Sequence, residues 1–444
     1  MKKIAITTLG CKVNQFESAG FATGFEALGC EMVPFQATAD VYVINTCTVT
    51  AKAGQQSRQL IRRILHAHPE ARIVVTGCYA QMDPETVLGL ADQPVTIIGN
   101  GNKHRLVEAA LAEGPPDLVM LMGQIRRKKE ICDLPVSRFR GRTRAYLRIQ
   151  DGCDNFCSYC IVPYTRGRSR SLPLAAVLRQ VKTFVDQGYR ELVVTGINVG
   201  KYGLDLAERQ SIYSLLDRIC GDFPQLRMRL SSIEPTEVND LLLELMLRHA
   251  NFMPHLHIPL QSGDDEVLAR MNRRYTRSEF AAVIQLVHRI LPSAAIGCDV
   301  LGGFPGESEQ AAENTYQLLA ELPVSYLHVF PYSRRPGTLA ATFGQQLPGP
   351  VKDARVQRLR ILDAEKRKRF YQDQIGQTHR VLVERRNLKS GLLQGFSENY
   401  MPIVFPGTTG LLRRVVPVRL TAMDHGQPFG GVVDELLEEN QGNG

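Results

Sequence analysis

The sequence lacks any apolar run of the roughly 18 or more residues that a membrane-spanning helix needs. Its first residues, MKKIAITTLGC, also lack the apolar core of a secretion signal, because the apolar stretch runs only from Ile4 to Leu9 and contains two threonines. Ten cysteines in a chain without such a signal are typical of a reducing compartment, where thiols bind metals instead of forming disulfides. We therefore expect a cytoplasmic protein that contacts no membrane.

Acidic residues are scarce in two parts of the chain, although the net charge of the whole protein is only +8. Segment 126–144 holds eight basic and two acidic residues, and segment 380–419 holds seven basic and two acidic residues. Either segment alone would fit an ordinary solvated surface. Two separate basic segments in one chain indicate a polyanionic partner such as a nucleic acid.

The most compact motif of the sequence lacks a fourth nearby ligand. Cys153, Cys157 and Cys160 have the spacing C-x3-C-x2-C, no histidine lies within thirty residues of them, and Cys132 is the nearest other cysteine. Structural zinc and structural iron–sulfur clusters both close their shells with four ligands, so a zinc knuckle and a closed cluster are disfavoured. Three cysteines leave one coordination position of the metal centre open, and an open coordination position is where a metal centre reacts.

Residues 1 to about 110 alternate β-branched runs with amphipathic helical stretches, which predicts an open, mainly parallel α/β sheet. The expected elements are strands Lys3–Thr8, Val41–Asn45 and Arg72–Thr76 and helices Gln15–Leu28 and Ala51–His66. Cys11, Cys47 and Cys78 each follow one of these strands. Because the carboxyl ends of parallel strands meet at one edge, we expect a shared second metal site rather than three separately buried thiols. The other cysteines are expected to be core or incidental residues: Cys30, Cys132, Cys220 and Cys298.

The central segment, 142–372, repeats a strand–helix unit six times, which predicts a (β/α)6 partial barrel that binds ligands at the strand carboxyl ends. Its expected strands are Tyr146–Gln150, Glu191–Thr195, Arg227–Ile233, His255–Leu260, Ala295–Val300 and Ser325–Phe330. Glu234, Gln261 and Asp299 lie at these ends and are candidate cofactor contacts. Four histidines near the same strands are expected to be hydrogen-bonded or packed rather than metal ligands: His249, His255, His257 and His328.

The flanking segments differ from the barrel in composition. Residues 111–141 form a linker. Pro115 and Pro116 break any helix there, and several arginines add positive charge. Asp353–Asp373 is a charged connecting helix. Residues 373–437 alternate short apolar runs with glycine-rich turns, which predicts a small antiparallel β-barrel suited to binding RNA.

The string QDGCDNFCSYCIVPYTRGRSRS resembles the radical S-adenosylmethionine (SAM) superfamily, and in particular its methylthiotransferase branch. That resemblance implies a 4Fe–4S cluster on Cys153, Cys157 and Cys160, which binds SAM and cleaves it to a 5′-deoxyadenosyl radical. The segments SSIEP, HIPLQSGDDEVLARMNR and GFPGE resemble those that surround SAM in this family.

Three further segments resemble the N-terminal domain of methylthiotransferases: LGCKVNQFES, VINTCTVTAKA and VVTGCYAQ. This resemblance implies an auxiliary 4Fe–4S cluster on Cys11, Cys47 and Cys78, which presents the sulfur. The C-terminal segment resembles the TRAM domain that ends many tRNA-modifying enzymes. The implied cofactors are thus two 4Fe–4S clusters and SAM, and the implied partners are tRNA, a reducing electron donor and a sulfur source.

The residues after Cys11, Lys-Val-Asn, and the sequence Thr-Cys-Thr-Val-Thr around Cys47 look like the branch that acts on N6-threonylcarbamoyladenosine in tRNA. The isopentenyladenosine branch usually has Gln-Met after its first cysteine, and the branch that modifies a ribosomal protein usually has Pro-Lys. The implied product is 2-methylthio-N6-threonylcarbamoyladenosine beside the anticodon. Two alternatives stay open: the same chemistry on isopentenyladenosine or a ribosomal protein, and a non-catalytic RNA-binding Fe–S protein.

Overall fold

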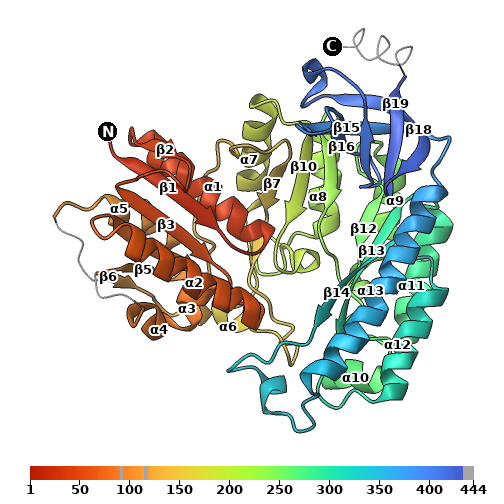
Figure 1. The fold of residues 1–444 in the computed structure, drawn as a ribbon, viewed down its shortest axis with the longest axis horizontal. Helices are drawn as coiled ribbons and strands as arrows, with labels where there is room; N and C mark the ends of the chain where they lie inside the picture. Colours follow the sequence, from red (N-terminus) through yellow and green to blue (C-terminus); the bar gives the residue numbers. More distant parts are fainter. Residues whose placement is uncertain (91–93, 115–118, 434–444) are drawn as a thin grey trace.

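The computed structural model describes residues 1–90, 94–114 and 119–433, so Pro115, Pro116 and the predicted barrel residues 434–437 lie outside the described residues. Figure 1 shows an N-terminal sheet in red and orange, a central barrel in yellow to cyan and a small C-terminal barrel in blue. This arrangement confirms the predicted mixed α/β architecture. Among the described residues, none of the helices combines the length and the apolar character that crossing a bilayer requires.

A six-stranded parallel sheet with the order β2-β1-β3-β4-β5-β6 forms the N-terminal part. The predicted strands are present as β1, β3 and β4, whereas β2, β5 and β6 are three residues long and too short to be visible as a sequence pattern. The strands are β1 (Lys3–Thr8), β2 (Glu31–Val33), β3 (Val41–Thr46), β4 (Arg72–Gly77), β5 (Thr96–Ile98) and β6 (Val119–Leu121). The helices are α1 (Lys12–Ala27), α2 (Ala51–Ala67), α3 (Cys78–Met82), α4 (Pro84–Leu88), α5 (Leu106–Leu111) and the 3-10 helix η1 (Asn100–Arg105).

Helices cover both faces of this sheet. Helix α1 buries Phe16 and Phe21 against one face, and α2 buries Ile61 against the opposite face. Successive side chains of a strand point to opposite faces, so Val43 joins the first apolar cluster and Ile44 joins the second. With both faces covered, the strand ends are the places where this sheet can hold functional groups.

Six parallel strands of the central part form an open barrel, as expected (Figure 1). Two three-stranded sheets, β7-β10-β11 and β12-β13-β14, are joined by bridges from Met228 to Phe252 and from Ser232 to His257. The barrel strands are β7 (Ala145–Arg148), β10 (Glu191–Thr195), β11 (Arg227–Leu230), β12 (His255–His257), β13 (Ala295–Gly302) and β14 (Tyr326–Pro331). The other elements include η2 (Ile125–Arg127), β8 (Gln150–Asp151), α6 (Val162–Arg166), β9 (Arg170–Ser171), α7 (Leu174–Asp186), α8 (Ile212–Asp222), α9 (Asp240–Arg248), α10 (Asp265–Arg270), α11 (Arg277–Ile290) and α12 (Glu309–Glu321).

The outer face of this barrel is apolar and the inner face is mainly polar. Leu192, Ile296 and Leu327 point outward, are at most 2% exposed, and belong to the same core as residues of α7, α8 and α11. Alternate residues of each strand therefore point inward. We call the space that they enclose the lumen, and its wall consists of Tyr146, Arg148, Glu191, Val193, Thr195, Arg227, Arg229, His255, His257, Asp299, Tyr326 and His328.

Helix α13 (Gly349–Gln372) packs against β14 and leads to the C-terminal barrel. The backbone N–H of Leu327 donates to Asp363 Oδ1 at 2.6 Å, and the guanidinium of Arg367 lies 4.7 Å from the ring centre of Tyr326. This helix is the predicted charged connector, and it begins four residues earlier than expected.

The C-terminal part is a closed five-stranded barrel with the order β15-β16-β17-β19-β18. Its strand pairs are antiparallel except for β17 with β19, which are parallel. The predicted small barrel is confirmed. One of its strands, β19, has no alternating apolar pattern, because its sequence, QPFGGV, contains a proline and two glycines. The strands are β15 (Thr378–Arg386), β16 (Leu393–Phe396), β17 (Pro402–Phe405), β18 (Val415–Asp424) and β19 (Gln427–Val432).

The C-terminal barrel closes the lumen at the amino ends of its strands. Arg229 Nη1 donates to the Glu398 carbonyl at 2.9 Å, and Arg229 Nη2 donates to the Ser397 carbonyl at 3.2 Å. The ring of Tyr400 lies 4.7 Å from the Arg229 guanidinium and 4.8 Å from the His255 ring. Tyr400 therefore plugs this end, and the lumen opens toward the carboxyl ends of its strands.

Candidate functional site

The structure brings the three N-terminal cysteines to one edge of the N-terminal sheet. Cys11 caps the start of α1 just after β1, Cys47 follows β3, and Cys78 begins α3 directly after β4. These three strands are neighbours in the sheet. Gly10 fits the arrangement because a β-carbon at this position would lie 2.7 Å from Cys47 Sγ.

The sulfurs of these cysteines are close enough for their charges to interact. Burial and the nearby Cys78 raise the pKa of Cys47 to about 11, and Cys11 adds to the shift. Desolvation of the sulfur and the nearby Cys78 also raise the pKa of Cys11, against the opposing charge of Arg166. Thiols with raised pKa values are protonated at neutral pH, and a metal that binds them displaces the protons.

Buried charged side chains lie beside these cysteines and join the N-terminal sheet to the central barrel. Arg166 Nη1 lies 3.1 Å from Glu17 Oε1 and 2.8 Å from Asp151 Oδ1. Lys103 Nζ lies 2.5 Å from Glu17 Oε2. The side chains of this buried charge cluster are at most 6% exposed, and its members are Glu17, Lys103, Arg148, Asp151, Arg166 and Arg170.

The buried charge cluster contains four cations and two carboxylates, which leaves an excess of two positive charges. Buried charge is strongly unfavourable unless opposite charge lies nearby. Arg166 is close enough to Cys11 and Cys78 for the charges of these groups to interact. Deprotonated cysteines would supply the missing negative charge, so this donor set fits an anionic metal cluster.

The loop that carries Cys153, Cys157 and Cys160 follows β8 at the carboxyl end of the barrel. The Cys160 N–H donates to the Cys157 carbonyl at 2.9 Å, which closes a tight turn. Ser158 anchors this turn, because its Oγ donates to the Arg270 carbonyl at 2.8 Å. All three cysteines are thereby held on one short, tightly anchored loop.

The surroundings of this loop also fit a bound metal cluster. Burial raises the pKa of Cys160 to about 12, with further contributions from Cys157 and Cys153. Arg273 Nη1 donates to Cys157 Sγ at 3.4 Å, and the same guanidinium pairs with Glu234. A cation beside a set of cysteine ligands favours their deprotonated form.

The predicted cofactor contacts lie on three different strands or strand ends. Glu234 follows β11 and is held by Arg273. Gln261 follows β12 with a left-handed φ of 68°, and its backbone bridges to Val300 of β13. Asp299 lies within β13 and points into the lumen.

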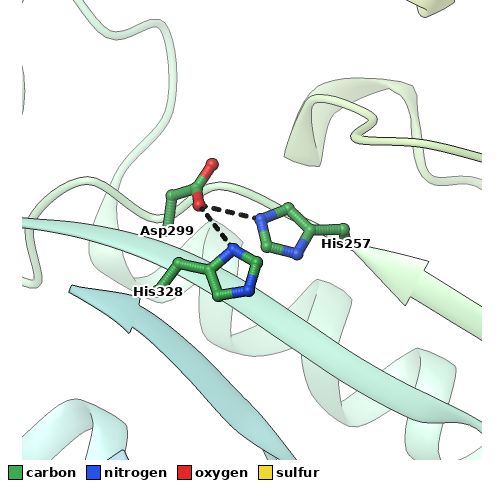
Figure 2. A group of neighbouring side chains, drawn as sticks. All are labelled: His257, Asp299 and His328. Carbon is green, nitrogen blue, oxygen red and sulfur yellow. Dashed lines mark ion pairs between the residues drawn. The ribbon is translucent and has the colours of Figure 1, made fainter. Parts of the chain in front are cut away.

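Asp299 is shared by two histidines in what we call the histidine–aspartate cluster, which consists of His257, Asp299 and His328. Figure 2 shows both imidazole rings directed at Asp299 Oδ1, with His257 Nε2 at 2.9 Å and His328 Nδ1 at 3.5 Å. Burial acts to raise the pKa of Asp299, but the hydrogen bonds and charges of His257 and then His328 hold it well below its usual range. The three side chains come from the neighbouring strands β12, β13 and β14.

Each of the four histidines has a hydrogen-bond or ion-pair partner. The Tyr326 hydroxyl lies 2.7 Å from His255 Nε2 and 3.2 Å from His257 Nδ1, so both rings point to the lumen side of β12. His249 pairs with Asp217 at 2.7 Å.

The four remaining cysteines belong to neither cysteine triplet. Cys30, Cys220 and Cys298 pack in or against the main apolar core, and Cys132 Sγ lies 3.4 Å from His104 Nδ1. This placement agrees with the expectation that they are core or incidental residues.

Sequence reasoning missed the cationic partners of the two cysteine sites. Arg166 lies six residues after Cys160, but its partner Glu17 is 149 positions away in the chain. Arg273 is likewise 116 positions from Cys157. No local pattern signals such contacts, because the fold alone brings the residues together.

Solved structures with a similar fold come from the radical SAM superfamily. The methyltransferase TsrM from Kitasatospora setae superposes with a TM-score of 0.56 and 16% sequence identity, covering 77% of each chain. The cobalamin-dependent enzyme OxsB superposes with a TM-score of 0.51 and 11% identity, covering 77% of this chain and 54% of that one. These similarities concern the fold.

Sequence comparison gives a more specific result. Residues 3–99 match the uncharacterized protein family UPF0004, and residues 147–319 match the radical SAM superfamily. The threonylcarbamoyladenosine tRNA methylthiotransferase MtaB of Bacillus subtilis is 37% identical, and the match spans 99% of this chain and 99% of that protein. The protein of the same name from Aquifex aeolicus is 38% identical, and the match spans 93% of this chain and 100% of that protein. A tRNA-2-methylthio-N(6)-dimethylallyladenosine synthase of Pelotomaculum thermopropionicum is 32% identical over 95% of both chains. The chain belongs to the methylthiotransferase family of the radical SAM superfamily.

Proposed function

We propose that this protein is a tRNA methylthiotransferase that adds a methylthio group to adenine C2 of N6-threonylcarbamoyladenosine, next to the anticodon. The observation that carries the proposal is the presence of two cysteine triplets at strand carboxyl ends, one of them beside the buried charge cluster. The near full-length similarity to proteins named for this substrate supports the choice of nucleoside.

Membership of the radical SAM superfamily supports an iron–sulfur cluster and SAM as cofactors. We assign the SAM-binding 4Fe–4S cluster to Cys153, Cys157 and Cys160. A second 4Fe–4S cluster is assigned to Cys11, Cys47 and Cys78. When bound, these groups supply the electron, the radical, the sulfur and the methyl group that substitution at an unactivated aromatic C–H requires.

The remaining proposed cofactor contacts are Glu234, Gln261 and Asp299, which would bind SAM. Both ion pairs of Asp299 use Oδ1, which leaves Oδ2 for a hydroxyl or ammonium group of SAM. Arg273 orients the Glu234 carboxylate and donates to Cys157 Sγ. The protein's part is thus to hold the reacting groups in place and to keep water out of the lumen, whose far end Tyr400 closes.

The proposed tRNA-binding surface combines the two basic segments. A cleft of about 400 Å³ is lined by Arg138, Arg140, Arg142 and Arg413, so it joins the linker to the C-terminal barrel. Arg138 and Arg140 share Glu26 as a partner, which leaves positive charge in excess. Arginines bind phosphates through charge and bidentate hydrogen bonds, as a folded RNA requires.

Four functional segments follow from this proposal. They are an N-terminal methylthiotransferase domain at 1–110, a basic linker at 111–141, a radical SAM core with its connecting helix at 142–372, and a TRAM-like barrel at 373–437. The proposed substrate is a tRNA and the ten cysteines lack disulfide partners among the described residues, which together support a cytoplasmic location.

Nucleoside mass spectrometry of tRNA from cells with and without the gene tests the substrate. We expect loss of the methylthio group from threonylcarbamoyladenosine when the gene is deleted, with isopentenyl-type nucleosides unchanged. Loss from the isopentenyl-type nucleoside instead would keep the chemistry but overturn the substrate, an alternative that the similarity to the Pelotomaculum protein raises. No change in either nucleoside would overturn the tRNA assignment in favour of a ribosomal protein.

A further inference from the structure

The members of the histidine–aspartate cluster differ in how much of each side chain a ligand can reach. His257 is 8% exposed, and both its nitrogens have partners: Nε2 pairs with Asp299 and Nδ1 contacts the Tyr326 hydroxyl. His328 is 49% exposed and uses only Nδ1 for Asp299. Figure 2 shows its other ring nitrogen pointing away from the carboxylate. His328 Nε2 is therefore the group of this cluster that faces the open part of the lumen.

Three arginines in the wall of the lumen, Arg148, Arg227 and Arg229, outnumber its two carboxylates, Glu191 and Asp299, so the electrostatic field there is positive on balance. Burial lowers the pKa of His255 well below its usual range, and the charges of Arg229, His257, Lys12 and then His328 lower it further. Lys12 begins α1 next to Cys11, is exposed, and forms no ion pair with another residue in the described ranges. A positive field with an accessible imidazole suits a ligand that carries a carboxylate.

We propose that His328 is a specificity-determining residue whose Nε2 hydrogen-bonds the carboxylate of the threonylcarbamoyl group, with Asp299 fixing the imidazole orientation through Nδ1. This inference rests on the proposed function and adds to it the residue that reads the N6 substituent. The threonylcarbamoyl group ends in a carboxylate and a hydroxyl, whereas an isopentenyl group is a hydrocarbon with no polar partner to offer.

The hydrogen bonds that the two nitrogens of an imidazole can make explain how His328 would distinguish the two N6 substituents. In its doubly protonated form His328 donates Nδ1–H to Asp299 and Nε2–H to the substrate. A site built around a hydrogen bond to a charged group rejects analogues that lack the partner. The neighbouring His257 keeps Asp299 oriented, because both rings share Oδ1.

Binding of anticodon stem-loop RNAs to the full-length, anaerobically reconstituted protein tests the proposal. The RNAs carry threonylcarbamoyladenosine, its carboxyl methyl ester, isopentenyladenosine or unmodified adenosine at the same position. For the wild-type protein we expect the threonylcarbamoyl RNA to bind at least about tenfold more tightly than the methyl ester or adenosine RNA, the factor that corresponds to ~1.4 kcal/mol. His328→Phe should remove this preference while keeping an aromatic ring in place.

His288→Phe is the matched control, because His288 is an exposed residue of the outer helix α11. It should leave the preference for the threonylcarbamoyl RNA unchanged. His328→Gln, which keeps a hydrogen-bond donor, should retain part of the preference and serves as the deciding variant if His328→Phe does not fold. Wild-type selectivity in a folded His328→Phe or His328→Ala protein would overturn the proposal.

Turnover and metal content distinguish failure of the His328 proposal from failure of the proposed function. If the wild-type enzyme methylthiolates the isopentenyl RNA and not the threonylcarbamoyl RNA, the proposed function fails together with the role of His328. If it methylthiolates the threonylcarbamoyl RNA and His328→Phe does so with the same KM, only the role of His328 fails. Stoichiometric zinc or manganese in the wild type that is lost in His328→Phe would also overturn that role, because the three ligand atoms, which lie within 4.8 Å of one another, would then be an occupied metal site.

Discussion

Arg166 shows how much of this protein depends on single buried side chains. Its guanidinium contacts Asn14 and Glu17 of α1 and Asp151 of β8, so one residue connects the N-terminal sheet to the central barrel. It also lies in the field of the N-terminal cysteines. Structural and functional roles coincide here, because the charge that joins the two parts also balances the proposed anionic cluster.

Arg166→Gln should destabilise the protein by about 3–5 kcal/mol, because it leaves Glu17 and Asp151 buried with fewer cationic partners. The control is Arg218→Gln, which removes an exposed i,i+4 pair with Asp222 and should change stability by less than about 1 kcal/mol. Chemical denaturation of both reconstituted variants measures the difference. Equal stability of the two variants would show that the buried contacts of Arg166 contribute no more than a surface pair.

The close packing of strands β12, β13 and β14 depends on one glycine of β13, Gly297. Gly297 is paired with Tyr326, and a β-carbon at position 297 would overlap the Tyr326 ring. That ring carries the hydroxyl shared by His255 and His257. Because glycine has no side chain, Gly297 of β13 leaves room for the Tyr326 ring and so fixes the hydrogen bonds between Tyr326 of β14 and the histidines of β12.

Gly297→Ala should lower the free energy of unfolding by about 1–3 kcal/mol through overpacking against Tyr326. Gly221→Ala is the matched control, since Gly221 lies in α8 with open space around it and alanine is the better helix former by up to ~1 kcal/mol. Thermal unfolding of the two variants gives the comparison. If Gly297→Ala proved as stable as Gly221→Ala, the Tyr326 ring would have to move freely, and the network would not be fixed by this contact.

The sequence predicted the elements with a strong local signal and missed those without one. The apolar run in Glu191–Thr195 predicted β10 with its observed bounds. The close spacing of one cysteine triplet and the strand-end positions of the other indicated the two candidate sites. The three-residue strand β5 is too short to show a period of two, although all its residues are β-branched, and β19 contains a proline and two glycines, which are uncommon in strands. The pairing of Asp299 with His328 depends on the register of β13 and β14, which no local pattern encodes.

At the scale of the whole molecule, the cysteine edge of the N-terminal sheet lies against the carboxyl end of the central barrel. Asn100 donates to the Thr165 carbonyl of α6 at 2.7 Å, and the Ala51 N–H donates to Ser333 Oγ, just beyond β14, at 2.8 Å. The two cysteine loops are therefore anchored at one interface, the one between the N-terminal sheet and the central barrel. At the other end of the lumen, the C-terminal barrel is fixed by Arg229 and Tyr400. The molecule thus holds two cysteine triplets and a basic cleft in fixed relation.

This arrangement predicts a division of labour between the two cysteine triplets. The reconstituted wild type should contain about eight iron atoms per chain, from two four-iron clusters, and Cys47→Ala and Cys157→Ala should each contain about four. Cys157→Ala should lose reductive SAM cleavage, since it removes a ligand from the open site in the barrel. Cys47→Ala should still cleave SAM but form no methylthiolated RNA, because it alters only the site on the N-terminal sheet.

Cys30→Ala is the control for these variants, because Cys30 lies away from both triplets and packs against the apolar core. It should keep about eight iron atoms and full product formation. The measurements are iron analysis, 5′-deoxyadenosine release and mass spectrometry of the RNA, all under anaerobic conditions. A wild-type iron content near four would contradict the second cluster, and methylthiolated RNA from either triplet variant would contradict the division of labour. If instead both triplet variants lost SAM cleavage, the two sites would not act independently.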